Sequence, residues 1–416
     1  MYQDYYETSF LLSETPSTIS WIGTIQGFIL AIAGSITGPT YDRGYFRYLI
    51  FTGTFFVTLG TMMTSLCSSY YQLVMAQGVC VGLGAACFWV PSTAILATYF
   101  DIKRNLMTAT AVAGSSIGAR DVHISGKLLL TTFVGAIIYP IVFRCLQPTI
   151  GFGWATRVIG LIALVLCSIS CAVMKPRVQP PTQPRALIDW SAFREGPFVL
   201  MCLGMFFTFT GVYVPFFYSP IYGSRMTGLD DKVSLYLLPV ISAGSIFGRV
   251  IPGLIADKAA PLNVLIPFGT VTAALTFAWL DITDALGLWI FCGLYGFFSG
   301  AFTCLPPTII AVLTPAMTRV GTRLGMCFTF AGFGLLIGNP IAGTTINIPD
   351  GEFHGAQIFS AATLTVGLAM FTLAWMLLMR ACKALKASLG GSLLVDISET
   401  AIVPARSITK HGRLAE

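Results

Sequence analysis

The sequence predicts an all-α membrane protein, because apolar residues dominate it, charged residues are scarce, and uncharged stretches of helical length recur along it. Of its 416 residues, 55% are hydrophobic and only 10% are charged. A soluble domain normally carries about 25% charged residues, so these charges are too few to cover a globule in water. Lipid-facing surface needs no charge, and a helix satisfies its own backbone hydrogen bonds inside the bilayer.

Membrane-spanning helices account for most of the chain. A helix needs about 20 apolar residues to cross the hydrocarbon core. The run Tyr48–Phe100 is long enough for two spans, and we expect a turn near Cys67–Tyr71. Eleven spans follow, in Thr18–Tyr41, Tyr48–Phe100 (two), the interrupted stretch 105–143, Val158–Met174, Gly196–Ser224, Val233–Ala256, Ala259–Leu280, Ala285–Thr318, Leu324–Pro349 and Gly355–Met379.

The Lys and Arg residues of the loops predict the orientation. One side of the membrane carries most of them, at Arg43, Arg47, Lys103, Arg104, Lys175, Arg177, Arg185, Arg194, Lys258, Arg319, Arg323, Arg380, Lys383 and Lys386. The other side holds Arg225 and Lys232, with Arg120, Lys127, Arg144 and Arg157 as exceptions around the interrupted span. Since cytoplasmic loops carry the excess of Lys and Arg, we expect the C-terminus in the cytoplasm and the N-terminus outside.

The two halves of the chain repeat at a constant offset in numbering. Gly38 matches Gly253 (253 − 38 = 215), and the other pairs at this offset are Asp42 and Asp257, Pro91 and Pro306, Thr93 and Thr308, and Arg104 and Arg319. Parallel repeats of this length predict two bundles of six helices. We expect an N-terminal half at 1–174, a proline-rich cytoplasmic linker at 175–196, a C-terminal half at 197–380 and a flexible cytoplasmic tail at 381–416.

The same offset predicts two irregularities. The span that begins at Pro197, moved back by this offset, falls at about −18 to 3, so we expect the first helix of the fold to be missing and to be encoded upstream of Met1. The offset falls to about 200 near the end of the first half, which predicts an insert at Ala119–Gly135. The insert carries Arg120 and Asp121, which suit a membrane span poorly. A retained intron is its simplest origin.

A glycine and charge motif ends the first span. It reads Gly34-x3-Gly38-x3-Asp42-Arg43-x3-Arg47, and its repeat copy contains Gly253, Asp257 and Lys258. Small residues let two helices approach closely, and an Asp can accept from the N-terminal N–H groups of a neighbouring helix. This loop resembles the major facilitator signature loop, which latches the cytoplasmic gate in that family. The alternative is an ordinary basic turn.

The wider sequence resembles the monocarboxylate porter family of the major facilitators, its fungal branch in particular. The stretches that carry the resemblance are Gln77–Gly84, Tyr139–Val142, Gly151–Arg157, Gly248-Arg249 and Pro252–Leu254. The resemblance implies the major facilitator fold, two parallel six-helix repeats, here with the first helix absent. It also implies alternating access and a plasma membrane location in preference to the vacuole.

Arg249 is the one charge well inside a span. A cation there costs about 2.5–3.5 kcal/mol on insertion scales, so its retention requires a partner. A carboxylate substrate can supply the anion through a bidentate contact, and in the resembled family an Arg at this position binds the substrate carboxylate. Animal members pair it with an Asp one turn earlier, where this chain has Ser245. The alternatives are that Arg249 snorkels, or that it pairs with helix-end carbonyls or with Asp257.

Several aromatic residues stand in spans that would border a substrate cavity. Trp89, Tyr213, Phe217 and Phe298 are the candidates for contact with a larger organic solute, and plain helix packing is the alternative for each. Fungal relatives in the resembled family include uptake carriers and exporters of secondary metabolites. We therefore expect a secondary-active transporter for a small organic solute, a carboxylate or an exported secondary metabolite. An uptake carrier and a non-functional truncated chain are the alternatives.

Other classes of protein fit poorly. A membrane enzyme needs polar catalytic groups in its spans, but the three His residues (His123, His354 and His411) are expected outside regular helices and form no cluster with Asp or Glu. A channel or a receptor does not require a parallel repeat. We expect no cofactor, no metal and no nucleic acid, because the basic residues form no stripe. The expected partners are lipid and a small organic solute, and a coupling proton stays open.

Overall fold

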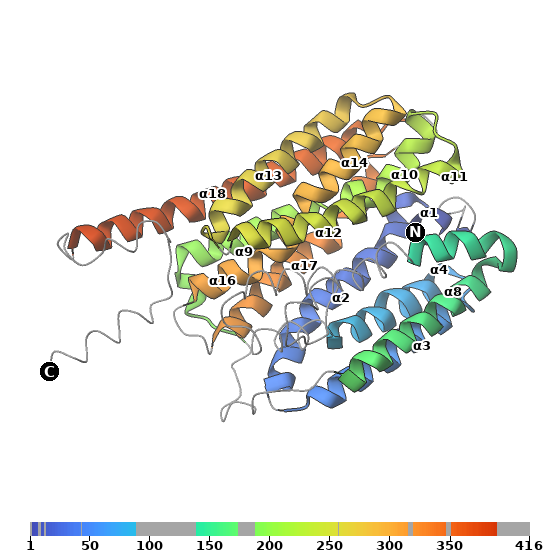
Figure 1. Ribbon diagram of the computed structural model, residues 1–416, viewed down its shortest axis with the longest axis horizontal. Helices are drawn as coiled ribbons and strands as arrows, with labels where there is room; N and C mark the ends of the chain where they lie inside the picture. Colours follow the sequence, from blue (N-terminus) through green and yellow to red (C-terminus); the bar gives the residue numbers. More distant parts are fainter. Residues whose placement is uncertain are drawn as a thin grey trace.

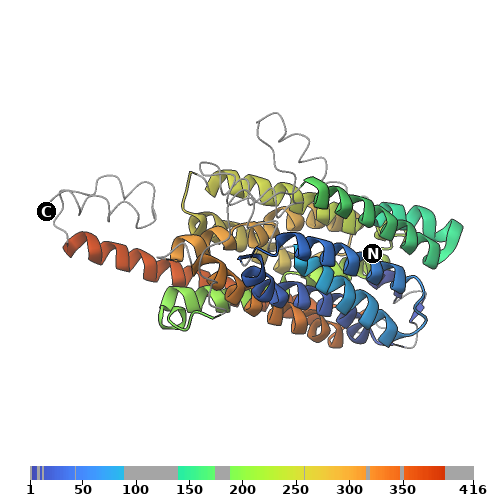
Figure 2. The same cartoon turned by 90° about the horizontal axis from the view of Figure 1, so that it is seen from below.

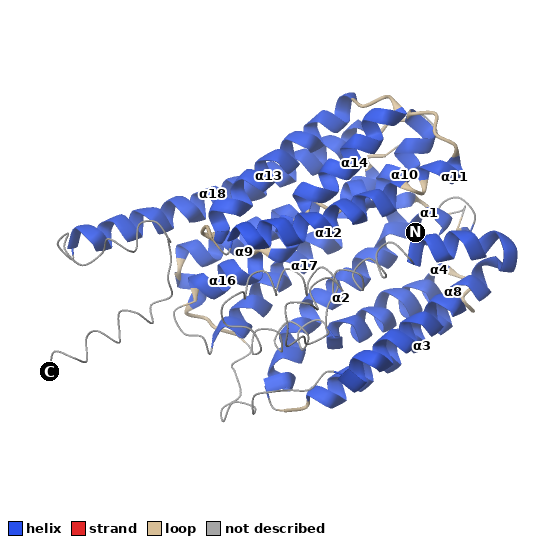
Figure 3. Cartoon of the chain, in the orientation of Figure 1, coloured by secondary structure: helices blue, strands red, loops and turns tan. Residues whose placement is uncertain are grey.

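The computed structural model describes residues 2–6, 10–11, 14–42, 44–88, 139–173, 188–256, 258–314, 319–346 and 351–388. Helices are the only regular elements within these ranges (Figure 3), so the predicted all-α architecture is confirmed. The predicted insert Ala119–Gly135 and the last part of the predicted tail, 389–416, lie outside the described residues.

The helices of the first half end with a bent one. The elements are α1 (Tyr2–Tyr5), α2 (Pro16–Asp42), α3 (Phe46–Thr64), α4 (Tyr70–Leu73), the π-helical η2 (Val74–Val81) and α8 (Tyr139–Val173). The sequence predicted a loop between Phe143 and Val158, and in the structure two helical parts of α8 meet there at a sharp kink at Gly151. Gly151 has φ 77° and ψ 168°, a conformation that glycine adopts at little cost, and it lets α8 change direction (Figure 1).

The second half contains η5 (Ala192–Arg194), α9 (Gly196–Gly211), α10 (Val214–Met226), α11 (Asp231–Ser234), α12 (Leu237–Ala256), α13 (Pro261–Ala278), η6 (Trp279–Asp281), α14 (Ala285–Ser299), α15 (Ala301–Cys304), α16 (Pro306–Leu313), α17 (Val320–Thr344) and α18 (His354–Ser388). Two expectations about α18 were wrong. His354 was expected outside regular helices but is the first residue of α18. Residues 381–388 were expected in a flexible tail but continue this helix, because Ala, Leu and Lys are good helix formers.

The observed spans agree with the predicted ones. Nine helical stretches of the described chain are long and apolar enough to cross a membrane, and Ser17–Ala33 is a shorter apolar stretch. These correspond to ten of the eleven predicted spans, and most of the remaining one, 105–143, lies outside the described residues. The predicted turn near Cys67–Tyr71 is confirmed, since α3 ends at Thr64 and α4 begins at Tyr70.

Equivalent helices of the two halves begin in register. Helix α3 begins at Phe46 and α13 at Pro261, which gives the offset found in the sequence (261 − 46 = 215). Helix α4 begins at Tyr70 and α14 at Ala285, which gives the same value (285 − 70 = 215). The repeat found in the sequence therefore recurs in the helix boundaries.

The two halves lie side by side (Figures 1 and 2). Helix α2 of the first half runs along α17 of the second half. Helices α1 and α11 and the C-terminal end of α10 lie together at one end of the bundle (Figure 1), which we call the α10 end. The long helix α18 leaves the bundle at the opposite end, which we call the α18 end.

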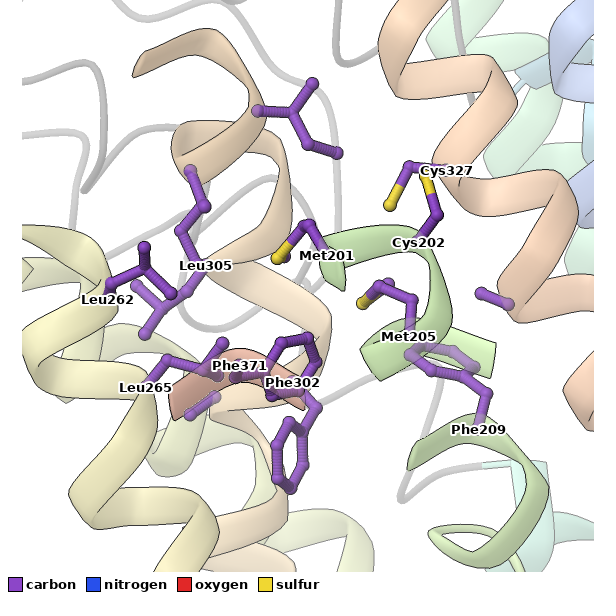
Figure 4. Packing of buried hydrophobic residues seen from close by; sticks show 14 of the residues in the cluster. Met201, Cys202, Met205, Phe209, Leu262, Leu265, Phe302, Leu305, Cys327 and Phe371 are labelled. Atoms are coloured by element: carbon purple, nitrogen blue, oxygen red, sulfur yellow. The ribbon is translucent and has the colours of Figure 1, made fainter. Parts of the chain in front are cut away.

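A buried apolar cluster fills the second half towards the α18 end. Met201 and Met205 of α9, Phe302 of α15 and Phe371 of α18 are at most 1% exposed (Figure 4). Gly204 makes room for Phe371, since a Cβ there would lie 2.4 Å from the ring. Lipid is as apolar as these side chains, so the cluster stabilises the bundle through van der Waals contact rather than through escape from water.

A buried ion cluster fixes the segment before α9 to the start of α17. Arg323 is 2% exposed and donates from Nη2 and Nη1 to the Glu195 carboxylate at 2.6 and 2.7 Å, and from Nε to Asp189 Oδ2 at 3.0 Å. A hydrogen bond from Ser191, with the charge of Arg323, holds the pKa of Asp189 below its ordinary value against the opposing effect of burial. Arg319 lies 3.6 Å from the same carboxylate. The sequence placed Arg323 in a basic loop and gave no sign of this cluster.

Glycines set the distance between helices. A Cβ on Gly296 of α14 would lie 2.1 Å from the Ile241 carbonyl oxygen of α12, so the two backbones touch. The same geometry occurs at Gly334 and Gly338 of α17, which are spaced by four and whose Cβ atoms would lie 2.2 and 2.0 Å from carbonyl oxygens of α9. Close approach of backbones is the usual basis of helix association in lipid.

We expect Gly296→Ala to disrupt the contact between α12 and α14, because neither the new methyl group nor the facing carbonyl can move away without separating the helices. The matched control is Gly293→Ala in the same helix, where the nearest atom to the new Cβ is 3.9 Å away. Thermal unfolding of the purified protein should show a large loss of stability for Gly296→Ala alone. Equal stability of the two variants would contradict this packing.

Candidate functional site

One membrane crossing, α9 and α10, is broken at Val212 and Tyr213. Pro215 follows in the first turn of α10 and has no N–H, so the carbonyl of Gly211 loses its usual helical partner. A carbonyl left without a partner inside a membrane costs several kcal/mol. Here the hydroxyl of Ser360 from α18 donates to the Gly211 carbonyl oxygen at 2.9 Å.

The second carbonyl at this break is also bound. The hydroxyl of Tyr295, from α14, donates to the Val212 carbonyl oxygen at 2.8 Å. Tyr295 is fully buried. The irregular backbone is therefore held by side chains from two other helices, and Tyr213 stands at a fixed place where the helix is interrupted.

A second crossing is also interrupted. Helix α14 ends at Ser299, the short α15 ends at Cys304, and α16 begins at Pro306. Pro306 and Pro307 remove two successive N–H donors, which explains why the helix is interrupted here. Cys304 is 1% exposed and stands at this interruption.

Arg249 lies beside both interruptions. Helix α12 begins at Leu237, and the rise per helical residue places Arg249 about 18 Å along it from the α10 end. Gly248, the residue before Arg249, packs on the second interruption, since a Cβ on Gly300 would lie 2.6 Å from the Gly248 carbonyl carbon. The side chains of Tyr213 and Cys304 are near enough for their charges to affect the Arg249 guanidinium. Broken helices are a common way to place polar groups at a binding site in the middle of a membrane, and here two of them meet at one cation.

A row of aromatic rings leads away from this point. The ring of Tyr213 lies 5.6 Å from that of Phe216 and 5.9 Å from that of Phe209, and Phe216 lies 6.2 Å from Tyr295. Tyr213 therefore connects Arg249 to a group of packed aromatic rings.

The other predicted aromatic contacts are separate from this group. Phe217 faces the first half, since a Cβ on Gly23 of α2 would lie 3.0 Å from its ring. Phe298 packs 5.3 Å from Phe268 of α13 and 5.0 Å from Phe297, and no described contact joins it to Arg249. Trp89 lies outside the described residues.

The residues of the predicted gating loop lie at helix ends. Gly38 and Asp42 belong to the last turns of α2, and Arg47 is exposed in the first turn of α3. In the repeat copy, Gly253 is buried in α12 and Lys258 is exposed just after it. Arg43 and Asp257 lie outside the described residues.

Sequence reasoning missed Cys304, Tyr295 and Ser360. The prolines inside apolar runs did carry a signal, because each removes a hydrogen bond that must be replaced within a membrane. Which side chain replaces it depends on helices that are distant in the sequence. Among the described residues, no group of three or more His, Cys, Asp or Glu side chains could hold a metal ion.

The comparisons with known proteins define the class. The family model for the Major Facilitator Superfamily matches residues 8–317, and the chain belongs to that superfamily of membrane transporters. The chain is 41% identical to the MFS-type transporter dbaD of Emericella nidulans over 347 residues, which are 83% of this chain and 74% of dbaD. It is 35% identical to the aspyridones efflux protein apdF of the same fungus over 368 residues, which are 88% of this chain and 71% of apdF.

Solved structures show the same fold. The Escherichia coli fucose:proton symporter FucP covers 89% of this chain, and 95% of its own chain, with a TM-score of 0.60 at 13% identity. The nucleoside transporter NupG covers 90% of this chain and 94% of its own, with a TM-score of 0.65 at 12% identity. The major facilitator fold expected from the sequence is thus confirmed.

We expect Tyr295→Phe to lower the free energy of unfolding by about 1–3 kcal/mol, because the buried carbonyl of Val212 loses its donor while the ring is kept. The control is Tyr71→Phe, which removes a hydroxyl from a ring that is 79% exposed. Thermal unfolding in detergent distinguishes the two. If Tyr295→Phe is as stable as the control, the bond at the helix break does not hold the site.

Proposed function

We propose that this transporter exports an organic anion, a carboxylate or an acidic secondary metabolite, and that Arg249 binds the anionic group. The observation that carries the proposal is the meeting of two interrupted helices at Arg249, with Tyr213 and Cys304 beside it. A guanidinium offers a planar pair of donors that fits a carboxylate.

The aromatic side of the site supports a solute larger than a simple acid. The rings of Tyr213 and Phe216 are only partly buried and lie 5.6 Å apart, and the buried ring of Tyr295 packs behind Phe216. An unsaturated or aromatic carbon skeleton would pack on the rings of Tyr213 and Phe216 while its acidic group binds Arg249. A related protein is named as an efflux protein for aspyridones, and this supports export as the direction.

We also propose membership of the monocarboxylate porter branch, a location in the plasma membrane, and an orientation with the α18 end in the cytoplasm. The excess of Lys and Arg supports the orientation, since Arg194, Lys258, Arg319 and Arg380 lie towards the α18 end. The loop that contains Asp42 and Arg47 is then cytoplasmic, where it would act as the gating latch.

The test compares organic acids with their methyl esters as ligands of the purified protein. A ligand that binds only the folded state raises the unfolding temperature. Within a panel of aromatic and aliphatic carboxylic acids, we expect some acids to stabilise the wild type while their esters do not. Arg249→Ala should abolish this effect, and Arg249→Lys should retain little of it, because Lys lacks the planar fork.

The matched control is Arg225→Ala, which removes an exposed cation at the end of α10 and should leave the response to acids intact. Stabilisation of Arg249→Ala by the same acids, with the same concentration dependence as in the wild type, would remove Arg249 from the binding site.

A further inference from the structure

Two of the contacts that join the halves of the transporter at the α10 end involve polar side chains. On one side, the hydroxyl of Ser17 in α2 donates to the Pro340 carbonyl oxygen of α17 at 2.8 Å. On the other side, the guanidinium carbon of Arg144 in α8 lies 3.7 Å from the centre of the Tyr236 ring, immediately before α12. Each contact pairs a residue of the first half with one of the second.

The two contacts differ in kind. Along α2 and α17 the backbones themselves approach, since a Cβ on Gly343 would lie 2.8 Å from the Cα of Ser17, and a Cβ on Gly332 would lie 2.9 Å from the Cβ of Ala31. The described part of α8 is joined to Tyr236 by a stacked side chain. The second contact can therefore open by rotation of side chains, whereas the first requires two packed helices to separate.

The chemistry of the stack suits a contact that forms and breaks. A cation is attracted to the face of an aromatic ring without a directional hydrogen bond. In the closed arrangement Nη1 of Arg144 is buried and has no hydrogen-bond partner among the described residues, which costs free energy that the stack partly offsets. Closing is thus only weakly favoured, as transport through two alternating states requires.

The stack is also connected mechanically to the proposed binding residue. Tyr236 directly precedes α12, and Arg249 belongs to that same helix. A shift of α12 when Tyr236 is released is therefore transmitted to Arg249 through a rigid element. Arg144 was one of the basic residues that departed from the Lys and Arg bias of the loops, and the stack supplies a reason for its position.

We propose that Arg144 on Tyr236 is the outer latch of this transporter, which closes the α10 end above the solute site and opens to release the solute. The proposal rests on the orientation given under the proposed function. It does not depend on the identity of the solute.

The test measures how fast Cys304 reacts with a charged, membrane-impermeant maleimide, using the full chain in sealed proteoliposomes of known orientation. Peptide mass spectrometry separates Cys304 from the other ten cysteines, all of which are free. With reagent at the α10 end, Arg144→Gln and Tyr236→Leu should each label Cys304 severalfold faster than the wild type. Tyr236→Phe keeps the ring face and should label at the wild-type rate.

Arg157→Gln is the matched control. Arg157 is also basic and in α8, but it contacts Ser65 and Trp154 of its own half, so its loss should not change the labelling of Cys304. Cys202, which is 1% exposed within the core of the second half, reports unfolding and should stay unlabelled in every variant.

Unchanged labelling of Cys304 in both Arg144→Gln and Tyr236→Leu, with the reagent on either side, would overturn the latch. Labelling of Cys202 together with Cys304 would also overturn it, since the variants would then have unfolded rather than opened. A rise seen only with reagent at the α18 end would overturn it as well, since breaking a contact at the α10 end must open that end. The labelling of Cys304 is measured without any solute. The latch can therefore be tested even if Arg249 does not bind an organic anion.

Discussion

The structure depends on one constraint, which is that backbone N–H and C=O groups inside the bilayer must find hydrogen-bond partners within the protein. Regular helices meet this constraint along most of the chain. Where Pro215 interrupts a crossing, the carbonyls of Gly211 and Val212 are bound by Ser360 and Tyr295. The interruption is therefore held in place by side chains from two other helices, α14 and α18, and it places polar groups in the membrane interior that a continuous helix would not provide.

The polar groups at the interruptions connect the fold with the proposed transport mechanism. Two interrupted crossings bring Tyr213 and Cys304 to Arg249, and α12 carries Arg249 on the same rigid element that begins beside Tyr236. Backbone contact at Gly296 holds α12 firmly against α14. A movement that opens one end of the bundle therefore displaces the cation as part of a packed unit, which is what alternating access requires of a binding residue.

Much of the fold could be predicted from the sequence, because membrane spans depend on composition and length alone and because the repeat constrains the helix starts. The site was only partly predictable: Arg249 stands out as a charge in a span, but Cys304 is one of eleven similar cysteines. The burial of Arg323 was missed, since its carboxylate partners are 128 and 134 residues away in sequence. The packing of Phe298 could not be predicted either, because its neighbour Phe268 belongs to another helix.

The central claim is that the solute's acidic group binds at Arg249, in the neighbourhood of Cys304. The most direct measurement is the rate at which a small thiol reagent modifies Cys304 in the purified protein, with and without a stabilising organic acid. We predict that the acid slows modification of Cys304 in a saturable way, while its methyl ester does not, and that the exposed Cys382 in the last part of α18 is unaffected. Equal rates at Cys304 with and without an acid that binds the protein would place the solute elsewhere and contradict the account.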